Sequence, residues 1–332
     1  MLAANALSAG AQALLRIDGL TVNYVSATRP ALSAVHLEIG AGEIVGVLGE
    51  SGSGKSTLAL AVLGLLCSPT RVAGSISFKG QELLRLDESG WQAIRGVRIA
   101  TILQEPGISF SPFMRVGNQI AEVIRAHDRC SKSDRRRRTE TLLADVGFAD
   151  INRICRAYPH QLSGGELHRI AIAQALACRP EVLIADEPTK SLDSTLQREI
   201  LALLQAVNRR SGCSLIFITH DPQLLAGFAQ RVVVMYAGHI VEEGPLSRVF
   251  GQPLHPYTKG LLRLTRSSLH QPLRRGERLP AIPGSLSELD PLATGCVFAP
   301  RCYARTSVCL TAPPNNIVPE DGRRVECFNY GS

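Results

Sequence analysis

The residues Gly49-Glu-Ser-Gly-Ser-Gly-Lys-Ser-Thr57 have the types and spacing that bind a phosphate chain. The three glycines let the backbone approach phosphate oxygens without an intervening side chain, and successive N–H groups can then point inward. Lys55 would reach the β- and γ-phosphates, and Ser56 would give its hydroxyl to Mg²⁺. We therefore expect these nucleotide-binding residues in the loop: Gly49, Ser51, Gly52, Ser53, Gly54, Lys55, Ser56 and Thr57.

The segments on either side of this loop support phosphate binding. Residues 43–48 predict a strand, and residues 58–67 form an apolar run that favours a helix. Strand, glycine-rich loop and helix in succession form the context that phosphate binding requires, and the helix N-terminus adds partial positive charge. The alternative, a flexible glycine-rich turn, does not explain the flanking strand and helix.

A second candidate group follows an apolar run at residues 182–185, where Asp186 and Glu187 end a predicted buried strand. Parallel sheets bind ligands at the carboxyl ends of their strands. Asp186 would hold Mg²⁺ through water, and Glu187 would polarise the attacking water. An acidic pair can also simply begin a loop, but together with the glycine-rich loop it predicts a hydrolytic nucleotide site.

The segment between these groups, Leu162-Ser-Gly-Gly-Glu166, narrows the class of enzyme. Ser163 followed by Glu166 is a capping-box pattern that predicts the start of a helix over residues 168–177. Two glycines leave the first amides bare, so this helix start is a second anion site. The segment resembles the signature of the ABC ATPases. That resemblance implies that Ser163, Gly164 and Gly165 contact the γ-phosphate of an ATP held by another subunit.

Four further residues resemble ABC ATPase motifs and occur in the expected order along the chain. Gln104 is similar to the Q-loop glutamine, and Asp193 to the D-loop aspartate that packs across a dimer. His220 is similar to the switch histidine, and Tyr24 to the aromatic residue that stacks on adenine. The resemblance implies two sets of residues: Glu187, His220 and Gln104 for catalysis, and Ser56, Gln104 and Asp186 for Mg²⁺.

The resemblance also implies a fold and a division into domains. We expect an α/β P-loop NTPase with a parallel-sheet core, an antiparallel β subdomain and a helical subdomain at about residues 106–172. The nucleotide-binding domain would span residues 14–255, and a C-terminal extension would span residues 256–332. The sequence has no internal repeat, so two composite ATP sites would need a second subunit.

Three C-terminal motifs resemble the dipeptide and oligopeptide importer ATPases, a group that includes nickel importers. They are His255-Pro-Tyr-Thr-Lys259, Ile282-Pro-Gly284 and Cys296-x-Phe-x-Pro-Arg-Cys302. This resemblance implies an ATPase that drives peptide uptake, with a homologous ATPase in a heterodimer, two membrane permeases and an external solute-binding protein. Import of nickel or another small solute is one alternative, and a soluble ABC ATPase outside transport is another. The proline density at residues 253–259 and 279–284 predicts an extended linker.

Four of the nine cysteines, Cys296, Cys302, Cys309 and Cys327, cluster near the C-terminus. They lack the close C-x₂₋₄-C pairs usual for structural zinc. Four thiolates in one loop can instead hold an iron–sulfur cluster. The family resemblance implies a structural [4Fe–4S] centre here. Zinc at irregular spacing and four reduced thiols are the alternatives, and a C-terminal redox or metal sensor is a further hypothesis.

Composition limits the class of partner and the location. The chain has 332 residues, is 45% hydrophobic and carries a formal net charge of +7, much of it in Arg135–Arg138. Because aromatic residues are only 5%, this basic run predicts a solvated helix face rather than a nucleic-acid surface. The first residues do not predict a secretory signal, and the longest apolar run is too short to cross a bilayer. We expect a peripheral protein at the cytoplasmic face of the inner membrane.

Overall fold

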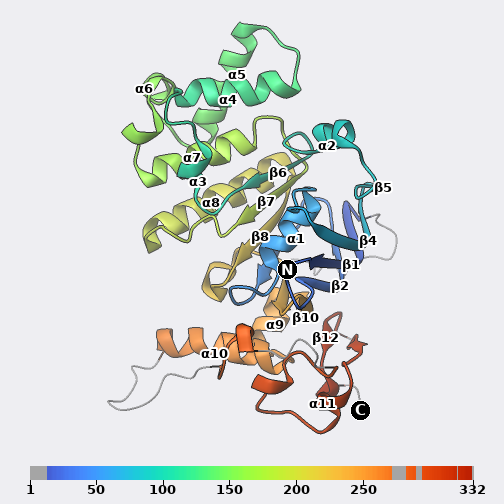
Figure 1. The fold of residues 1–332 in the computed structure, drawn as a ribbon. Coiled ribbons are helices and arrows are strands. Elements are labelled where there is room, and N and C mark those ends of the chain that lie inside the picture. Colours follow the sequence, from blue (N-terminus) through green and yellow to red (C-terminus); the bar gives the residue numbers. More distant parts are fainter. Residues whose placement is uncertain (1–12, 271–281, 289–293, 320, 331–332) are drawn as a thin grey trace. The chain divides into compact units, whose positions relative to one another are not determined.

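The computed structural model describes residues 13–270, 282–288, 294–319 and 321–330 (Figure 1). Contacts within the chain define two compact units. The first unit comprises Met1–Gly40, Val45–Leu84 and Thr219–Ser332, and the second comprises Ala41–Ile44 and Arg85–Ile218. The described residues beyond 255 therefore belong to the same compact unit as the glycine-rich loop. The predicted boundary between residues 255 and 256 stays a proposal.

The first unit contains an antiparallel sheet with the strand order β2-β1-β4-β5. Along β1, buried Leu15 and Ile17 alternate with exposed Arg16 and Asp18, which is the pattern of a strand with one face in the core. This sheet is the predicted antiparallel β subdomain. The strands are β1 Leu15–Tyr24, β2 Leu32–Ile39, β4 Thr70–Phe78 and β5 Gln81–Glu82.

A second group of strands in the first unit has the order β11-β12-β10-β9-β3. Strand β3 (Ile44–Leu48) pairs in parallel with β9 (Arg231–Tyr236), and every residue of both is buried. The other pairings in this group are antiparallel, so strands near the C-terminus extend the sheet that carries β3. The remaining elements of this unit are β10 His239–Pro245, β11 Asn316–Ile317, β12 Arg324–Glu326, α1 Lys55–Val62, α9 Leu246–Gly251, α10 Pro256–His270 and α11 Val308–Thr311.

The prediction of an extended linker at residues 253–259 is wrong for residues 256–259, which are helical. Of the second predicted stretch, 279–284, residues 279–281 lie outside the described residues. Helix α10 begins at Pro256, because proline is tolerated in the first turn of a helix, where its missing N–H would have no partner. Buried Glu242 on β10 accepts hydrogen bonds from the N–H groups of Leu254 and His255, both at 2.9 Å. These bonds fix the start of α10 against the sheet.

An aromatic cluster joins the C-terminal residues to the end of β9. The ring centroid of Tyr236 lies 4.7 Å from that of Tyr257 and 5.1 Å from that of Phe298. The ring of His255 lies 5.6 Å from Phe298 and is also buried. Aromatic rings bury large apolar areas, so this cluster makes the C-terminal residues part of the hydrophobic core of the first unit.

The second unit contains three parallel strands in the order β8-β7-β6 and most of the helices (Figure 1). Helices α4 to α7 pack on one another and form the predicted helical subdomain. Within α5, Arg136 and Arg137 are largely exposed and pair with Glu140 and Asp134, as expected for a solvated helix face. The elements are β6 Ile99–Ile102, β7 Val182–Asp186, β8 Ser214–Thr219, α2 Glu88–Ile94, α3 Pro106–Ser109, α4 Val116–His127, α5 Lys132–Asp145, α6 Ile151–Arg156, α7 Gly164–Ala175 and α8 Ser194–Ser211. Among the described residues, no helix combines the length and apolar character needed to span a membrane.

The buried ring of His255 predicts how the stability of the first unit depends on pH. Burial, with a smaller contribution from Lys259, lowers the pKa of His255 to about 3. The stabilising effect of keeping this ring neutral is complete above its unfolded pKa and is lost as pH falls from about 6.5 toward the folded value. We expect His255 to lower the free energy of unfolding by about 2 kcal/mol between pH 7 and pH 5.

Chemical denaturation of the wild type and of His255→Gln at both pH values measures this term. The variant should lose less stability on acidification than the wild type. His127→Gln, a change at an exposed histidine, serves as the matched control and should behave as the wild type. An equal loss of stability in His255→Gln and wild type would contradict the assignment.

Candidate nucleotide site

The glycine-rich loop between β3 and α1 requires glycine at two positions. A Cβ on Gly49 would lie 2.3 Å from the carbonyl oxygen of Met235 and 2.6 Å from the Ser53 hydroxyl, and both contacts are prohibitive. Gly54 caps α1 with a φ of 106°, a left-handed conformation that residues with a Cβ adopt only at a cost. The loop is therefore closely packed against β9 and cannot carry side chains at these points.

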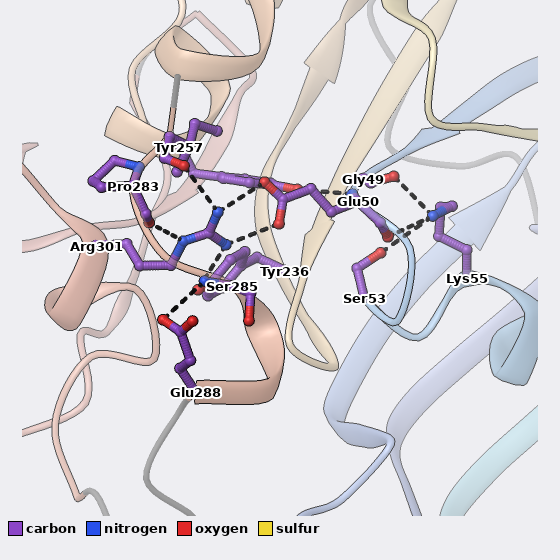
Figure 2. Close-up of polar contacts among 11 residues, drawn as sticks. Gly49, Glu50, Ser53, Lys55, Tyr236, Tyr257, Pro283, Ser285, Glu288 and Arg301 are labelled. Atoms are coloured by element: carbon purple, nitrogen blue, oxygen red, sulfur yellow. Dashed lines mark hydrogen bonds and ion pairs between the residues drawn. The ribbon is translucent and has the colours of Figure 1, made fainter. Parts of the chain in front are cut away.

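The side chain of Lys55 lies against the backbone of this loop, beside Gly49, Glu50 and Ser53 (Figure 2). Its side chain is buried, and Nζ donates to the carbonyl oxygens of Gly49 and Glu50, both at 2.8 Å. It also lies 3.4 Å from Oγ of Ser53. A buried cation surrounded by the backbone of a glycine-rich loop, at the start of a helix, is an arrangement that binds phosphate oxygens.

The other predicted residues of the first unit differ in exposure. Ser51, Gly52 and Ser56 are exposed, Gly54 and Thr57 are half-buried, and Ser53 is fully buried. Tyr24 ends β1 with its side chain half-buried, and His220 is exposed just after β8. The exposure of Ser56 leaves its hydroxyl accessible to a ligand of the loop.

In the second unit, the end of β7 brings Asp186 and Glu187 together. Glu187 has a φ of 45°, which is uncommon for a residue with a side chain, and its N–H donates to the Ile218 carbonyl at 3.0 Å. Such a conformation costs about 1–2 kcal/mol and is concentrated at functional sites. The Glu187 carboxylate is 13% exposed, and Nζ of Lys190 lies 3.2 Å from it.

The predicted capping box at the start of α7 is present. The Ser163 hydroxyl accepts from the Glu166 N–H at 3.3 Å, and the Glu166 carboxylate accepts from the Ser163 N–H at 2.9 Å. Hydrogen bonds from Arg153 and from Ser163 hold the pKa of Glu166 below its ordinary value, so the carboxylate is ionised near neutral pH. The helix begins at Gly164, four residues earlier than predicted, because the capping box fixes its start.

Gly164 and His168, both in the first turns of α7, differ in how accessible they are. A Cβ on Gly164 would meet nothing within 4 Å, so the backbone at this helix start is open to a partner. His168 is buried, and burial holds its pKa below the ordinary value, so the neutral ring donates from Nδ1 to the Gly164 carbonyl at 2.8 Å. This hydrogen bond from His168 stabilises the first turn of α7.

Asp193 and Gln104 lie at the ends of other elements of the second unit. The Asp193 side chain caps α8 by accepting from the N–H groups of Leu196 and Thr195 at 3.0 and 2.9 Å, and these bonds hold its pKa below the ordinary value. Gln104 follows β6 by two residues and is half-buried. The roles assigned to these residues from the sequence stay predictions.

Comparison with known proteins identifies the family. Residues 32–190 match the family described as ABC transporter, and residues 241–309 match the oligopeptide/dipeptide transporter C-terminal region. The chain is 41% identical over 318 residues to the dipeptide transport ATP-binding protein DppD of Escherichia coli strain K12, covering 95% of this chain and 96% of that protein. The chain belongs to the ABC transporter ATP-binding proteins of the peptide-importer family.

Further relatives of this ABC ATPase agree. It is 40% identical to the oligopeptide transport ATP-binding protein OppD of the same strain, over 96% of this chain and 94% of that protein. Among solved structures, the ATP-binding cassette MJ0796 bound to ADP and Pi is 29% identical with a TM-score of 0.62, over 70% of this chain and 98% of that chain. CbiO1 from Clostridium perfringens is 27% identical with a TM-score of 0.65, over 78% and 95%. These likenesses confirm the predicted α/β P-loop fold.

Among the described residues, the four C-terminal cysteines of the ABC ATPase are not found as a metal-binding group. Within the described residues, no group of three or more His, Cys, Asp or Glu side chains is placed to hold a metal ion. Burial raises the pKa of the Cys296 thiol to about 11 and also raises the pKa values of Cys302 and Cys327, so these thiols are protonated at neutral pH when no metal is bound. The structure therefore gives no support to the [4Fe–4S] cluster or to zinc.

Two residues of the ABC ATPase that contact the phosphate loop, Tyr257 and Arg301, were missed in the sequence. The N–H of Glu50 donates to the Tyr257 hydroxyl at 2.8 Å, and its carboxylate pairs with Arg301. Tyr257 and Arg301 occur in two of the C-terminal motifs, where they served only as family markers. The acidic residue Glu50 within a phosphate-binding loop is the sequence signal that could have suggested a neutralising cation such as Arg301.

We expect the side chain of Lys190 to lower the rate of ATP hydrolysis. Its ammonium lies 3.2 Å from the Glu187 carboxylate, so a movement of that carboxylate toward a water molecule, in its predicted role, would have to weaken this ion pair. Because Lys190 is half exposed, the effect is screened by solvent and small. We expect Lys190→Gln to raise the kcat of ATP hydrolysis about two- to five-fold at low salt.

Steady-state ATPase assays of wild type and Lys190→Gln across a salt series measure this effect. The difference should shrink at high ionic strength, since salt screens the interaction. Lys132→Gln, at an exposed lysine of α5, is the matched control. A kcat that is unchanged or lower in Lys190→Gln at low salt would show that the ion pair does not restrain Glu187.

Proposed function

We propose that this ABC ATPase hydrolyses ATP to drive the uptake of di- and oligopeptides through partner permeases. The observation that carries the proposal is the buried Lys55 cradle in a chain whose C-terminal residues match the oligopeptide/dipeptide transporter region. The names of the curated relatives, dipeptide and oligopeptide transport proteins, support peptides as the cargo. No observation favours nickel import or a role outside transport.

We propose that the predicted residues divide the reaction among them. Lys55 and Thr57 bind the phosphates, and Tyr24 stacks on the adenine. Ser56, Gln104 and Asp186 would hold Mg²⁺, which would neutralise charge on the phosphates. Glu187 accepts a proton from the attacking water, and His220 contacts the γ-phosphate. Ser163, Gly164, Gly165 and Asp193 act on the ATP of a partner subunit, so hydrolysis requires a dimer.

A rigid apolar loop in the second unit fits a permease contact. Phe113 is 92% exposed and Ile108 is 79% exposed. The buried amide of Gln119 accepts from the Ser111 N–H at 2.9 Å and donates to the Met114 carbonyl at 2.8 Å, which holds the loop in place. Since the chain belongs to an importer family, we propose that a helix of a membrane permease covers Phe113. The ATPase would then bind at the cytoplasmic face of the membrane as a peripheral subunit.

We further propose that the complex contains a homologous ATPase, two permeases and an external solute-binding protein. The dimeric state of the solved cassette MJ0796 supports pairing of two such ATPases, and the family match supports the permeases. A heterodimer and a binding protein rest on the family resemblance.

Replacement of the proposed base tests the chemistry. Glu187→Gln keeps the shape of the side chain but cannot accept a proton, so kcat should fall about 100-fold or more. ATP binding should remain, because the phosphate loop is unchanged, and the purified variant should retain ATP. Glu122→Gln, at an exposed residue of α4, is the control and should hydrolyse ATP as the wild type does. Wild-type turnover by Glu187→Gln would exclude its role.

Truncation of Phe113 tests the permease contact. In proteoliposomes with the permeases, Phe113→Ala should reduce stimulation of the ATPase by peptide-loaded binding protein about ten-fold, because exposed aromatic anchors dominate interfaces. The ATPase activity of the isolated protein should not change. Val318→Ala, which alters another exposed apolar residue, is the control. If the loaded binding protein never stimulates the wild type, the transport proposal itself fails.

A further inference from the structure

The second residue of the phosphate loop, Glu50, forms a two-pronged ion pair with an arginine near the C-terminus (Figure 2). Nη1 of Arg301 lies 2.8 Å from Oε2 of Glu50, and Nη2 lies 3.1 Å from Oε1. The Arg301 side chain is 6% exposed and the Glu50 side chain is 28% exposed. Bidentate pairs of this kind are strong and directional, so the position of each residue depends on the other.

Groups other than Glu50 also hold the Arg301 guanidinium in position. Its Nε donates to the carbonyl oxygen of Pro283 at 2.6 Å, and its Nη1 lies 3.4 Å from the Tyr236 hydroxyl. The guanidinium also lies 5.6 Å from the centre of the Tyr236 ring, within range of a cation–π interaction. The partners of Arg301 fix its orientation from two sides, so it presents a preorganised cation to the loop.

The backbone of Glu50 is held by the same C-terminal part of the chain. Its N–H donates to the hydroxyl of Tyr257 on α10 at 2.8 Å. Tyr257 is fully buried, and burial raises its pKa, so the hydroxyl stays protonated at physiological pH. Both the amide and the carboxylate of Glu50 therefore depend on residues that follow the nucleotide-binding motifs in sequence.

Glu50 links these contacts directly to Lys55. The carbonyl oxygen of Glu50 accepts from Lys55 Nζ at 2.8 Å and from the Ser53 N–H at 3.2 Å. A movement of Glu50 would therefore displace the carbonyl that holds the phosphate-binding cation. Its carboxylate would also repel a nucleotide phosphate if no cation neutralised it.

We propose that Arg301 and Tyr257 are positioning residues for ATP binding, which hold Glu50 and neutralise its carboxylate so that the phosphate loop accepts the polyphosphate. The inference rests on the proposed function, since it assumes that this loop binds ATP. It assigns to the C-terminal region a direct part in nucleotide affinity, in addition to any role that its four cysteines have. Neither residue touches the reacting atoms.

The test uses the full chain and measures the Kd for MgATP together with KM and kcat. Arg301→Gln leaves the Glu50 carboxylate charged and unpaired near the phosphates, so the Kd and KM should rise about ten-fold or more while kcat changes little. Tyr257→Phe removes the acceptor of the Glu50 N–H and should raise the Kd about two- to five-fold.

A double variant separates positioning from a general loss of structure. Glu50→Gln with Arg301→Gln removes the unpaired charge, so its Kd should return to within about three-fold of the wild-type value. Arg323→Gln is the matched control: Arg323 is another buried arginine of the C-terminal region, which pairs with Asp321. Arg323→Gln should leave the Kd for MgATP unchanged.

The outcomes distinguish this inference from the proposed function. A wild-type protein that does not bind MgATP contradicts the proposed function. A wild type that binds MgATP, with an unchanged Kd in Arg301→Gln, contradicts the positioning role alone. If Arg301→Gln does not fold, Tyr257→Phe and the double variant decide: wild-type affinity in Tyr257→Phe, or no recovery in the double variant, contradicts the inference.

Discussion

A buried ammonium group inside a glycine-rich loop is the interaction on which the candidate site depends. Lys55 donates to the carbonyls of Gly49 and Glu50, and the loop that carries these carbonyls packs closely against Met235 at the end of β9. Leaving a lysine cation buried is costly unless its donors are satisfied, so the loop carbonyls stabilise it. The N–H groups of the Lys55 ammonium can also donate to phosphate oxygens. The contact between Lys55 and the loop carbonyls therefore contributes both to the local fold and to the preference for a phosphate ligand.

The C-terminal region extends this constraint beyond the nucleotide-binding motifs. Strand β12 pairs with β10, Glu242 fixes the start of α10, and the aromatic cluster around Tyr236 joins α10 to β9. These contacts place Arg301 and Tyr257 against Glu50. A C-terminal region that packs this way is part of the core of the first unit, and most of it lies in the family match at residues 241–309.

The sequence alone predicts the parts of the site that depend on local chemistry. The glycine-rich loop and the capping box of Ser163 and Glu166 involve residues close in sequence, so their geometry follows from spacing. The Arg301–Glu50 pair joins residues 251 positions apart, and no local pattern encodes it. The left-handed backbone of Glu187 was missed for a related reason, since it reflects a hydrogen bond to Ile218 on a neighbouring strand.

One prediction from a local pattern is wrong, and one expectation from the family resemblance finds no support in the structure. Proline density at residues 253–259 predicted an extended segment, but Glu242 stabilises the start of a helix there through a contact between distant residues. The family resemblance implied an iron–sulfur cluster at the four cysteines, yet no metal-binding group is found among the described side chains. For the proline-rich segment, composition was a weaker guide than the tertiary contacts around it.

The dependence of transport on the buried lysine is tested by uptake of a labelled dipeptide into proteoliposomes that contain the permeases, this ATPase with its homologous partner, and the binding protein. We expect ATP-dependent accumulation with the wild type and almost none with the Lys55→Ala variant, because that variant lacks the cation that binds the phosphates. Equal accumulation with Lys55→Ala and wild type would show that the Lys55 cation is not needed for transport.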